Sequence, residues 1–220
     1  MAQIYQGFRL LGTEKISYCA PVLLVHSSTS GIQSEEAVNP GRRVMENKRD
    51  LSISMARANV IVMFISIPVI IVQFTVFIMV HGMEKLEPTW NSVILIVMVL
   101  LGVVVHELIH GITWVIFGHK QFSAIKYGFQ WKTLTPYAHL KEPVEVNAYR
   151  IGAFMPGFIL GILTYILSVL LGDGNLFWFG LVHTSAAGGD WLILWLIRNV
   201  KAGMQVEDHP TNAGCYVIES

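Results

Sequence analysis

Long, mainly apolar runs constrain this 220-residue chain more than any other feature of its sequence. A helix rises about 1.5 Å per residue, so about 20 apolar residues cross the hydrocarbon core of a bilayer. Four runs reach that length, and they cover residues 58–80, 91–118, 151–171 and 176–197. We therefore expect an all-α membrane protein with four transmembrane helices.

Charge excludes one common class of partner. Only 14% of the residues are charged, against about 25% in ordinary soluble domains. Fifteen Lys and Arg balance fifteen Asp and Glu, so no net positive charge favours binding of nucleic acid. The two cysteines, Cys19 and Cys215, lie near opposite ends of the chain and form neither a disulfide framework nor a CxxC zinc motif.

The distribution of Lys and Arg predicts the orientation of the four spans, because short loops rich in these residues stay on the cytoplasmic side. Every Lys and Arg except Lys85 precedes the first span, lies between the second and third, or follows the fourth. We expect both termini in the cytoplasm. The predicted domains are a polar N-terminal segment (1–50), a transmembrane domain (51–200) and a cytoplasmic tail (201–220).

The second run is interrupted by an HExxH pattern, His106-Glu107-Leu-Ile-His110. Histidines four positions apart share one face of a helix and can bind one zinc ion, while the glutamate can act as general base on water. A charged residue inside a bilayer costs roughly 2.5–3.5 kcal/mol and needs a partner. The sequence offers Glu107 no nearby Lys or Arg, so a metal site explains the pattern better than chance does.

A zinc site needs a third protein ligand, and the fourth run offers Asp190 and His183. Counted from the outer ends of their helices, His106 and His110 lie at depths of about 22 and 28 Å. Asp190 lies at about 21 Å and His183 at about 10 Å, so depth selects Asp190. His183 could line the route to the metal, stabilise a reaction intermediate, or simply form an interhelical hydrogen bond.

The cytoplasmic connection between the second and third spans contains alternating apolar and polar stretches at 122–127 and 135–140. Such alternation predicts short β-strands, and an exposed strand edge could pair with an unwound substrate. His139 in the second stretch could contact substrate or supply a ligand, or be a surface histidine. Near the C-terminus, Glu207, Asp208 and His209 are interpreted as part of a solvated tail.

The combination of His106-Glu107-Leu-Ile-His110-Gly111 with Ser185-Ala-Ala-Gly-Gly-Asp190 resembles a bacterial membrane family of zincin-type peptidases, over roughly residues 45 to 205. That family is distantly similar to the site-two proteases, which are intramembrane zinc metalloproteases. The resemblance implies a Zn²⁺ cofactor, the ligands His106, His110 and Asp190, the base Glu107, and a multi-pass protein of the bacterial cell membrane. Two departures from the site-two pattern are Gly188-Gly189 in place of Asn-Pro and Trp191 in place of Gly.

The leading hypothesis is an intramembrane zinc metallopeptidase that hydrolyses peptide bonds, with the lipid bilayer as surroundings and a membrane protein or peptide as substrate. Hydrolysis of another amide is a second enzymatic hypothesis. A catalytically inactive metal-binding scaffold or regulator would need no base beside the first ligand, so Glu107 distinguishes it. An ion- or proton-translocating protein is the remaining alternative, and four spans without a visible inverted repeat are few for a carrier.

Overall fold

The computed structural model describes residues 48–131 and 135–219, and most of these residues are helical. They belong to one unit, Asn39–Ser220. The helices are α2 (Met55–His81), α3 (Ser92–Phe117), α4 (Val146–Pro156), the π-helical η3 (Gly157–Leu163), α5 (Thr164–Leu171), α6 (Gly174–Ala186) and α7 (Gly188–Leu196), with 3₁₀ turns η1 (Glu84–Leu86) and η2 (Phe122–Ala124). The strands are β1 (Lys48–Ile53), β2 (Ile125–Gln130), β3 (Thr135–Leu140), β4 (Val144–Glu145), β5 (Gln205–Asp208) and β6 (Ala213–Ile218).

Three helices are long and apolar enough to cross a membrane: α2, α3, and the continuous helix Val146–Leu171 formed by α4, η3 and α5. Large apolar side chains cover their outer surfaces, including Met79, which is 80% exposed, and Leu100, which is 61% exposed. Lipid is the surrounding in which such a surface is stable. Three of the four predicted spans are therefore present with nearly the expected bounds.

The fourth predicted span, 176–197, is observed as two helices, α6 and α7, that are separated at Ala187. With 13 and 9 residues, they are about 20 and 14 Å long, and neither reaches the length of a spanning helix alone. Successive glycines favour such a break, because glycine weakens a helix interior by about 1 kcal/mol. The count of four continuous spanning helices is thus not confirmed.

Small residues at this break bring three helices together. A Cβ added at Gly157 in η3 would lie 2.5 Å from the Ala187 methyl carbon, and one at Gly188 would lie 2.5 Å from a Val62 methyl carbon in α2. A Cβ at Gly161 would lie 2.7 Å from the backbone nitrogen of Thr184. The glycines of this region therefore allow close helix packing.

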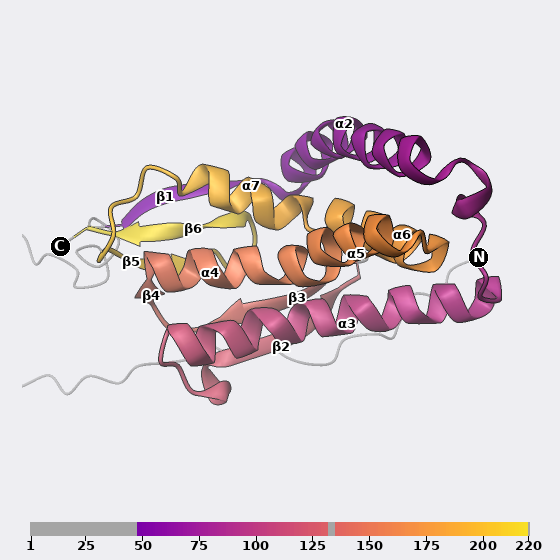
Figure 1. The fold of residues 1–220 in the computed structure, drawn as a ribbon. Coiled ribbons are helices and arrows are strands. Elements are labelled where there is room, and N and C mark those ends of the chain that lie inside the picture. The colour runs from indigo at the N-terminus through magenta and orange to yellow at the C-terminus, as the bar shows by residue number, and fades with distance from the viewer. Residues whose placement is uncertain (1–47, 132–134, 220) are drawn as a thin grey trace, which may run out of the picture. The chain divides into compact units, whose positions relative to one another are not determined.

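The predicted β-structure between the second and third spans is confirmed as an antiparallel hairpin of β2 and β3. The second predicted strand, 135–140, has its expected bounds, whereas the first begins three residues later, because Phe122–Ala124 forms a 3₁₀ turn. In Figure 1 the hairpin runs beside the C-terminal half of α3, and β3 contacts that helix. This places the hairpin next to the HExxH segment.

A second, four-stranded antiparallel sheet corrects the prediction of a solvated tail. Its order is β1-β6-β5-β4, so the C-terminal segment forms the two central strands, and residues 48–53 pair with them. The fold is therefore mostly helical with two small sheets, and not all-α. The remainder of the polar N-terminal segment, residues 1–47, lies outside the described residues, as does Cys19.

Apolar residues of this sheet share a buried core with the ends of α3, α4 and α7. Trp114, Tyr149 and Val217 are among its members. Cys215 is buried there and forms no disulfide. Burial raises the pKa of its thiol to about 12, helped by the nearby carboxylates of Asp208 and Asp50, so the thiol stays protonated at neutral pH. The core holds the sheet against the helix ends that carry the site.

Candidate metal centre

Helix α3 presents both predicted histidines to the protein interior. His106 and His110 are 8% and 7% exposed, whereas Leu108 and Ile112 on the same helix are more than 40% exposed and face outward. The ring centroids of the two histidines lie 4.9 Å apart. The helical spacing therefore brings the two imidazoles onto one buried face, as expected from the HExxH pattern.

Asp190 from α7 meets both imidazoles. Its Oδ2 lies 3.0 Å from His106 Nε2, and its Oδ1 lies 3.4 Å from His110 Nε2. One ligand atom from each of the three residues lies within 4.8 Å of the others, which is a separation that one metal ion can bridge. Because α7 begins at Gly188, Asp190 lies in its first turn, where the helix dipole stabilises a carboxylate by about 0.3–1 kcal/mol.

The second nitrogen of His110 is also held in place. Its Nδ1 lies 2.9 Å from the backbone oxygen of Gly152 in α4. A carbonyl oxygen can only accept, so Nδ1 carries the hydrogen, and Nε2, which faces Asp190, is the nitrogen that could bind a metal ion. This is the tautomer that a metal-binding histidine requires. Two imidazole nitrogens and a carboxylate oxygen are a donor set that suits zinc, so the residues present fit the expected ion.

Aromatic stacking supports the same histidine from the other side. The His110 ring stacks on the Trp114 ring with 5.5 Å between their centroids, and the Trp114 ring stacks on the Tyr149 ring with 5.8 Å between theirs. Gly152 has no side chain where the Trp114 indole lies, and a Cβ at that position would overlap the indole nitrogen. Gly152 therefore provides the carbonyl oxygen that contacts His110 and also leaves space for the Trp114 ring.

Glu107, the predicted base, is partly exposed and lines a cavity. The backbone N–H of Ala138 in β3 interacts with its carboxylate. No basic side chain of the described residues forms an ion pair with Glu107. A carboxylate left with free lone pairs beside a metal site can accept a proton from water.

The cavity has a volume of about 930 Å³. Its walls come from α2, α3, α4, α7, the β2–β3 hairpin and the turn between β5 and β6. The metal-binding triad and Glu107 all line it. Aromatic side chains form much of the hairpin wall, namely Phe129, Trp131 and Tyr137. Sequence reasoning foresaw the triad but not the contribution of α2 or of the C-terminal turn.

The other two predicted site residues are located differently. His139 lines the cavity, and its Nδ1 lies 3.0 Å from Asp208 Oδ2. The hydrogen bond to Asp208 raises the pKa of His139 above its usual value of 6.5. His183 is completely buried in α6 beside Gly102 and packs on Phe179, with 4.4 Å between ring centroids. It does not line the cavity.

Asp208 is the residue that sequence reasoning underestimated. Its Oδ1 accepts a 2.7 Å hydrogen bond from the Tyr149 hydroxyl, and its Oδ2 faces His139 and the backbone N–H of Leu140. It thereby joins β5, α4 and β3. The sequence around Asp208 does not indicate that it links these elements, because each of its partners lies more than 50 residues away.

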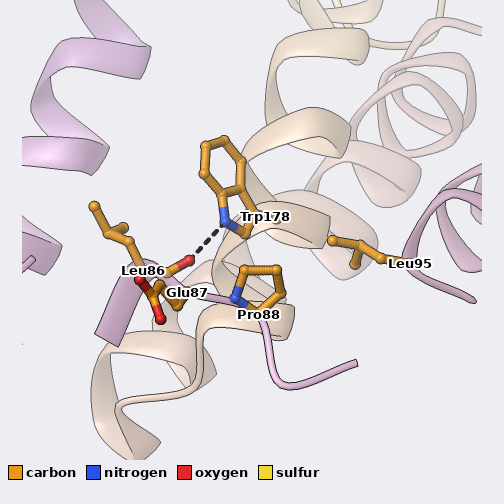
Figure 2. Close-up of a pocket in the computed structure, with 5 residues that line it drawn as sticks. All are labelled: Leu86, Glu87, Pro88, Leu95 and Trp178. Atoms are coloured by element: carbon orange, nitrogen blue, oxygen red, sulfur yellow. Dashed lines mark hydrogen bonds between the residues drawn. The ribbon is translucent and has the colours of Figure 1, made fainter. Parts of the chain in front are cut away.

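A second, smaller cavity of about 410 Å³ lies between η1, the start of α3 and α6 (Figure 2). It is lined by Leu86, Glu87, Pro88, Leu95 and Trp178, and the Trp178 indole N–H donates a 2.9 Å hydrogen bond to the Leu86 carbonyl oxygen. Its lining contains a single carboxylate and no histidine or cysteine. This lining offers no set of metal ligands.

Two histidines one helical turn apart, a glutamate next to the first and an acidic third candidate ligand match the residue pattern of zincin-type metal centres. In agreement with this class, residues 99–204 match the family described as "Putative zincin peptidase". The match includes all three candidate ligands and Glu107. No curated protein and no solved structure matches the chain.

Proposed function

We infer that this protein is a membrane-embedded zinc metallopeptidase that hydrolyses peptide bonds with Glu107 as general base. The observation that carries this proposal is the convergence of His106, His110 and Asp190 to within 4.8 Å, in the cavity that Glu107 also lines. The zincin family match over residues 99–204 supports the same conclusion.

In this proposal α6 and α7 together complete a fourth crossing of the membrane. An interrupted helix is tolerated at membrane depth only where its free backbone groups are buried in protein. Ala187 at the break is 0% exposed and packs against η3, which meets that condition. Four crossings and the distribution of Lys and Arg put both termini in the cytoplasm, in agreement with a protein of the bacterial cell membrane.

This orientation puts the site near the cytoplasmic end of α3, since His106 and His110 belong to the second half of that helix. The hairpin and the sheet adjoin the same end, and polar residues of both, including His139 and Asp208, line the cavity. Hydrolysis needs water, and a cavity with polar walls at the cytoplasmic surface supplies it more readily than the middle of the bilayer does.

His106, His110 and Asp190 would hold the ion. When bound there, zinc supplies a Lewis acid that makes water nucleophilic near neutral pH and polarises a carbonyl group. Glu107 takes the proton of the attacking water and returns it to the departing amine. The Gly152 carbonyl keeps His110 in the required tautomer. Ala138, through its backbone N–H, orients the Glu107 carboxylate.

The shape of the cavity favours an extended polypeptide with apolar side chains as substrate. Its volume of about 930 Å³ accommodates several residues, and its hairpin wall is aromatic. Glu107 and the β2–β3 hairpin line the same cavity, so an extended substrate lying along the hairpin would pass beside the base. A helical substrate segment would have to unwind before it could bind in this way.

The test uses full-length protein purified in detergent. We expect about one zinc per chain by plasma mass spectrometry and hydrolysis of casein, which has no stable fold. Glu107→Gln should retain zinc and lose activity by about 100-fold or more, because a general base contributes 10²–10⁴-fold. Tyr216→Phe, which changes a tyrosine of β6 outside the cavity, is the matched control.

Wild-type activity in Glu107→Gln would contradict the enzymatic role. Zinc bound to a folded wild type that cleaves neither casein nor apolar membrane peptides would favour a metal-binding scaffold. Charge movement in proteoliposomes that depends on membrane potential and is lost in His106→Ala would favour ion translocation instead. A folded wild type that stays metal-free after loading with zinc would contradict the metal site itself.

A further inference from the structure

The β2–β3 hairpin rests on α3 through one face. Alternate residues of a strand point to the same side, so Ile125 and Tyr127 of β2 share a face with Ala138 and Leu140 of β3. Ile125 pairs with Leu140, and Tyr127 pairs with Ala138. Ile125 and Leu140 are 7% and 1% exposed. This face of the hairpin is therefore the one packed on the protein.

Tyr127 touches α3 at Gly111, the residue directly after the second histidine. A Cβ added at Gly111 would overlap the Tyr127 hydroxyl, would lie 2.9 Å from its ring Cζ and would lie 3.1 Å from Ile125 Cδ1. Only glycine leaves this space on the helix surface. Gly111 thus forms a notch into which the Tyr127 hydroxyl fits.

The cross-strand partner of Tyr127 contacts the same turn of α3. Ala138 lines the cavity together with Glu107, and its backbone is close enough to interact with the Glu107 carboxylate. Glu107 precedes Gly111 by four residues, so both lie on one helix face. Tyr127 also lies close enough to Glu107 for the two to interact electrostatically. Burial raises the pKa of the Tyr127 hydroxyl, and the Glu107 carboxylate raises it further. The β2–β3 pair therefore contacts one turn of α3 at two places, through Tyr127 at Gly111 and through Ala138 at Glu107.

We propose that Tyr127 is a positioning residue, which sits in the Gly111 notch and thereby holds the Ala138 N–H against the base Glu107. This inference rests on the proposed function for the role of Glu107, but the contact itself does not depend on catalysis. The metal ligands are held by other elements, since Gly152 of α4 orients His110 and α7 carries Asp190. Loss of the Tyr127 contact should therefore misplace the base and leave the metal bound.

The two contact residues allow a complementation test. Gly111→Ala adds a methyl group where the Tyr127 hydroxyl lies, and Tyr127→Phe removes that hydroxyl. The double variant relieves the main overlap and leaves the milder contacts with the ring Cζ and with Ile125 Cδ1. Tyr216→Phe is the control, because it removes a tyrosine hydroxyl from the other sheet.

Amide hydrogen exchange of the peptide 136–140 is measured in the full-length protein in detergent, together with zinc content and casein hydrolysis. We expect Gly111→Ala to raise exchange of this peptide about tenfold, because the hairpin opens locally, with the zinc content unchanged and casein hydrolysis reduced. The double variant should exchange more slowly than Gly111→Ala and recover part of the activity. Tyr127→Phe alone should raise exchange by less, and Tyr216→Phe should match the wild type.

Wild-type exchange in Gly111→Ala, loss of zinc from it, or a double variant that exchanges as fast as Gly111→Ala would each overturn the proposal. If Gly111→Ala does not fold, wild-type exchange in Tyr127→Phe overturns it instead. Exchange needs no turnover, so a wild type that hydrolyses nothing contradicts the proposed function and leaves the exchange comparison valid.

Discussion

Two partly buried aspartates, Asp190 and Asp208, each face histidine side chains, and they differ in the groups that their carboxylate oxygens contact. Asp190 faces two imidazole nitrogens, one on each oxygen, at 3.0 and 3.4 Å. Asp208 faces one histidine, and it also accepts hydrogen bonds from the Tyr149 hydroxyl and the Leu140 N–H.

The difference separates a candidate metal site from a structural link. His110 keeps its Nδ1 hydrogen on the Gly152 carbonyl, so its Nε2 and the Asp190 oxygens can donate lone pairs to one ion. At Asp208 the carboxylate oxygens already face three groups from two other elements, Tyr149 of α4 and His139 and Leu140 of β3. The same residue types could therefore bind a metal ion at Asp190 and hold elements of the fold together at Asp208. Four predictions test this comparison.

The largest effect is expected from the ligands themselves. His110→Ala and Asp190→Asn should each weaken zinc binding by more than about 100-fold, because changes to groups that merely orient the ligands already cost about 10- to 100-fold. Asp208→Asn should retain zinc. Competition with a chromogenic chelator measures the affinities, and zinc loss in Asp208→Asn as large as in Asp190→Asn would erase the distinction between the two aspartates.

Gly152→Ala should have the next largest effect. Its methyl group would overlap the Trp114 indole, and such overpacking costs about 1–3 kcal/mol. Moving the Gly152 carbonyl away from His110 should also weaken zinc binding. Thermal unfolding in detergent and the chelator assay measure the two effects. Gly189→Ala is the control for unfolding, since a Cβ there would meet no atom within 4 Å.

Tyr149→Phe should have a smaller effect. It keeps the ring that stacks on Trp114 and removes only the hydroxyl that donates to Asp208. We expect a loss of about 1–3 kcal/mol in the free energy of unfolding, as for a hydrogen bond to a charged group, with unchanged zinc affinity. Denaturant titration measures the loss. An unchanged midpoint would show that Asp208 does not stabilise the fold through Tyr149.

The smallest effect concerns pH. Asp208 raises the pKa of His139 above 6.5, so the pair contributes its full stability below pH 6.5 and loses it as pH rises through the higher folded-state pKa. The difference in melting temperature between wild type and His139→Gln should therefore shrink between pH 6 and 9. Taking the difference cancels the titration of the other histidines. A difference that grows with pH would contradict the raised pKa.

The sequence by itself determined much of the fold and part of the site. Three helices of spanning length follow from mainly apolar runs, because the thickness of the bilayer sets their length. His106 and His110 share a face because the helical repeat is 3.6 residues. Depth counting selected Asp190 over His183, and the structure brings Asp190 to the two histidines. These features depend on local geometry or on a single external length, so they can be deduced residue by residue.

Only the tertiary structure decided which distant segments meet. The break at Ala187, which puts Asp190 in the first turn of α7, depends on how closely α2 and η3 approach there. Asp208 looked like part of a solvated tail, because its partners are far away in sequence. The Gly152 carbonyl and the Ala138 N–H are backbone groups that every residue carries, so no side-chain pattern could single them out. Packing between segments selects among such groups, and packing is a property of the whole fold.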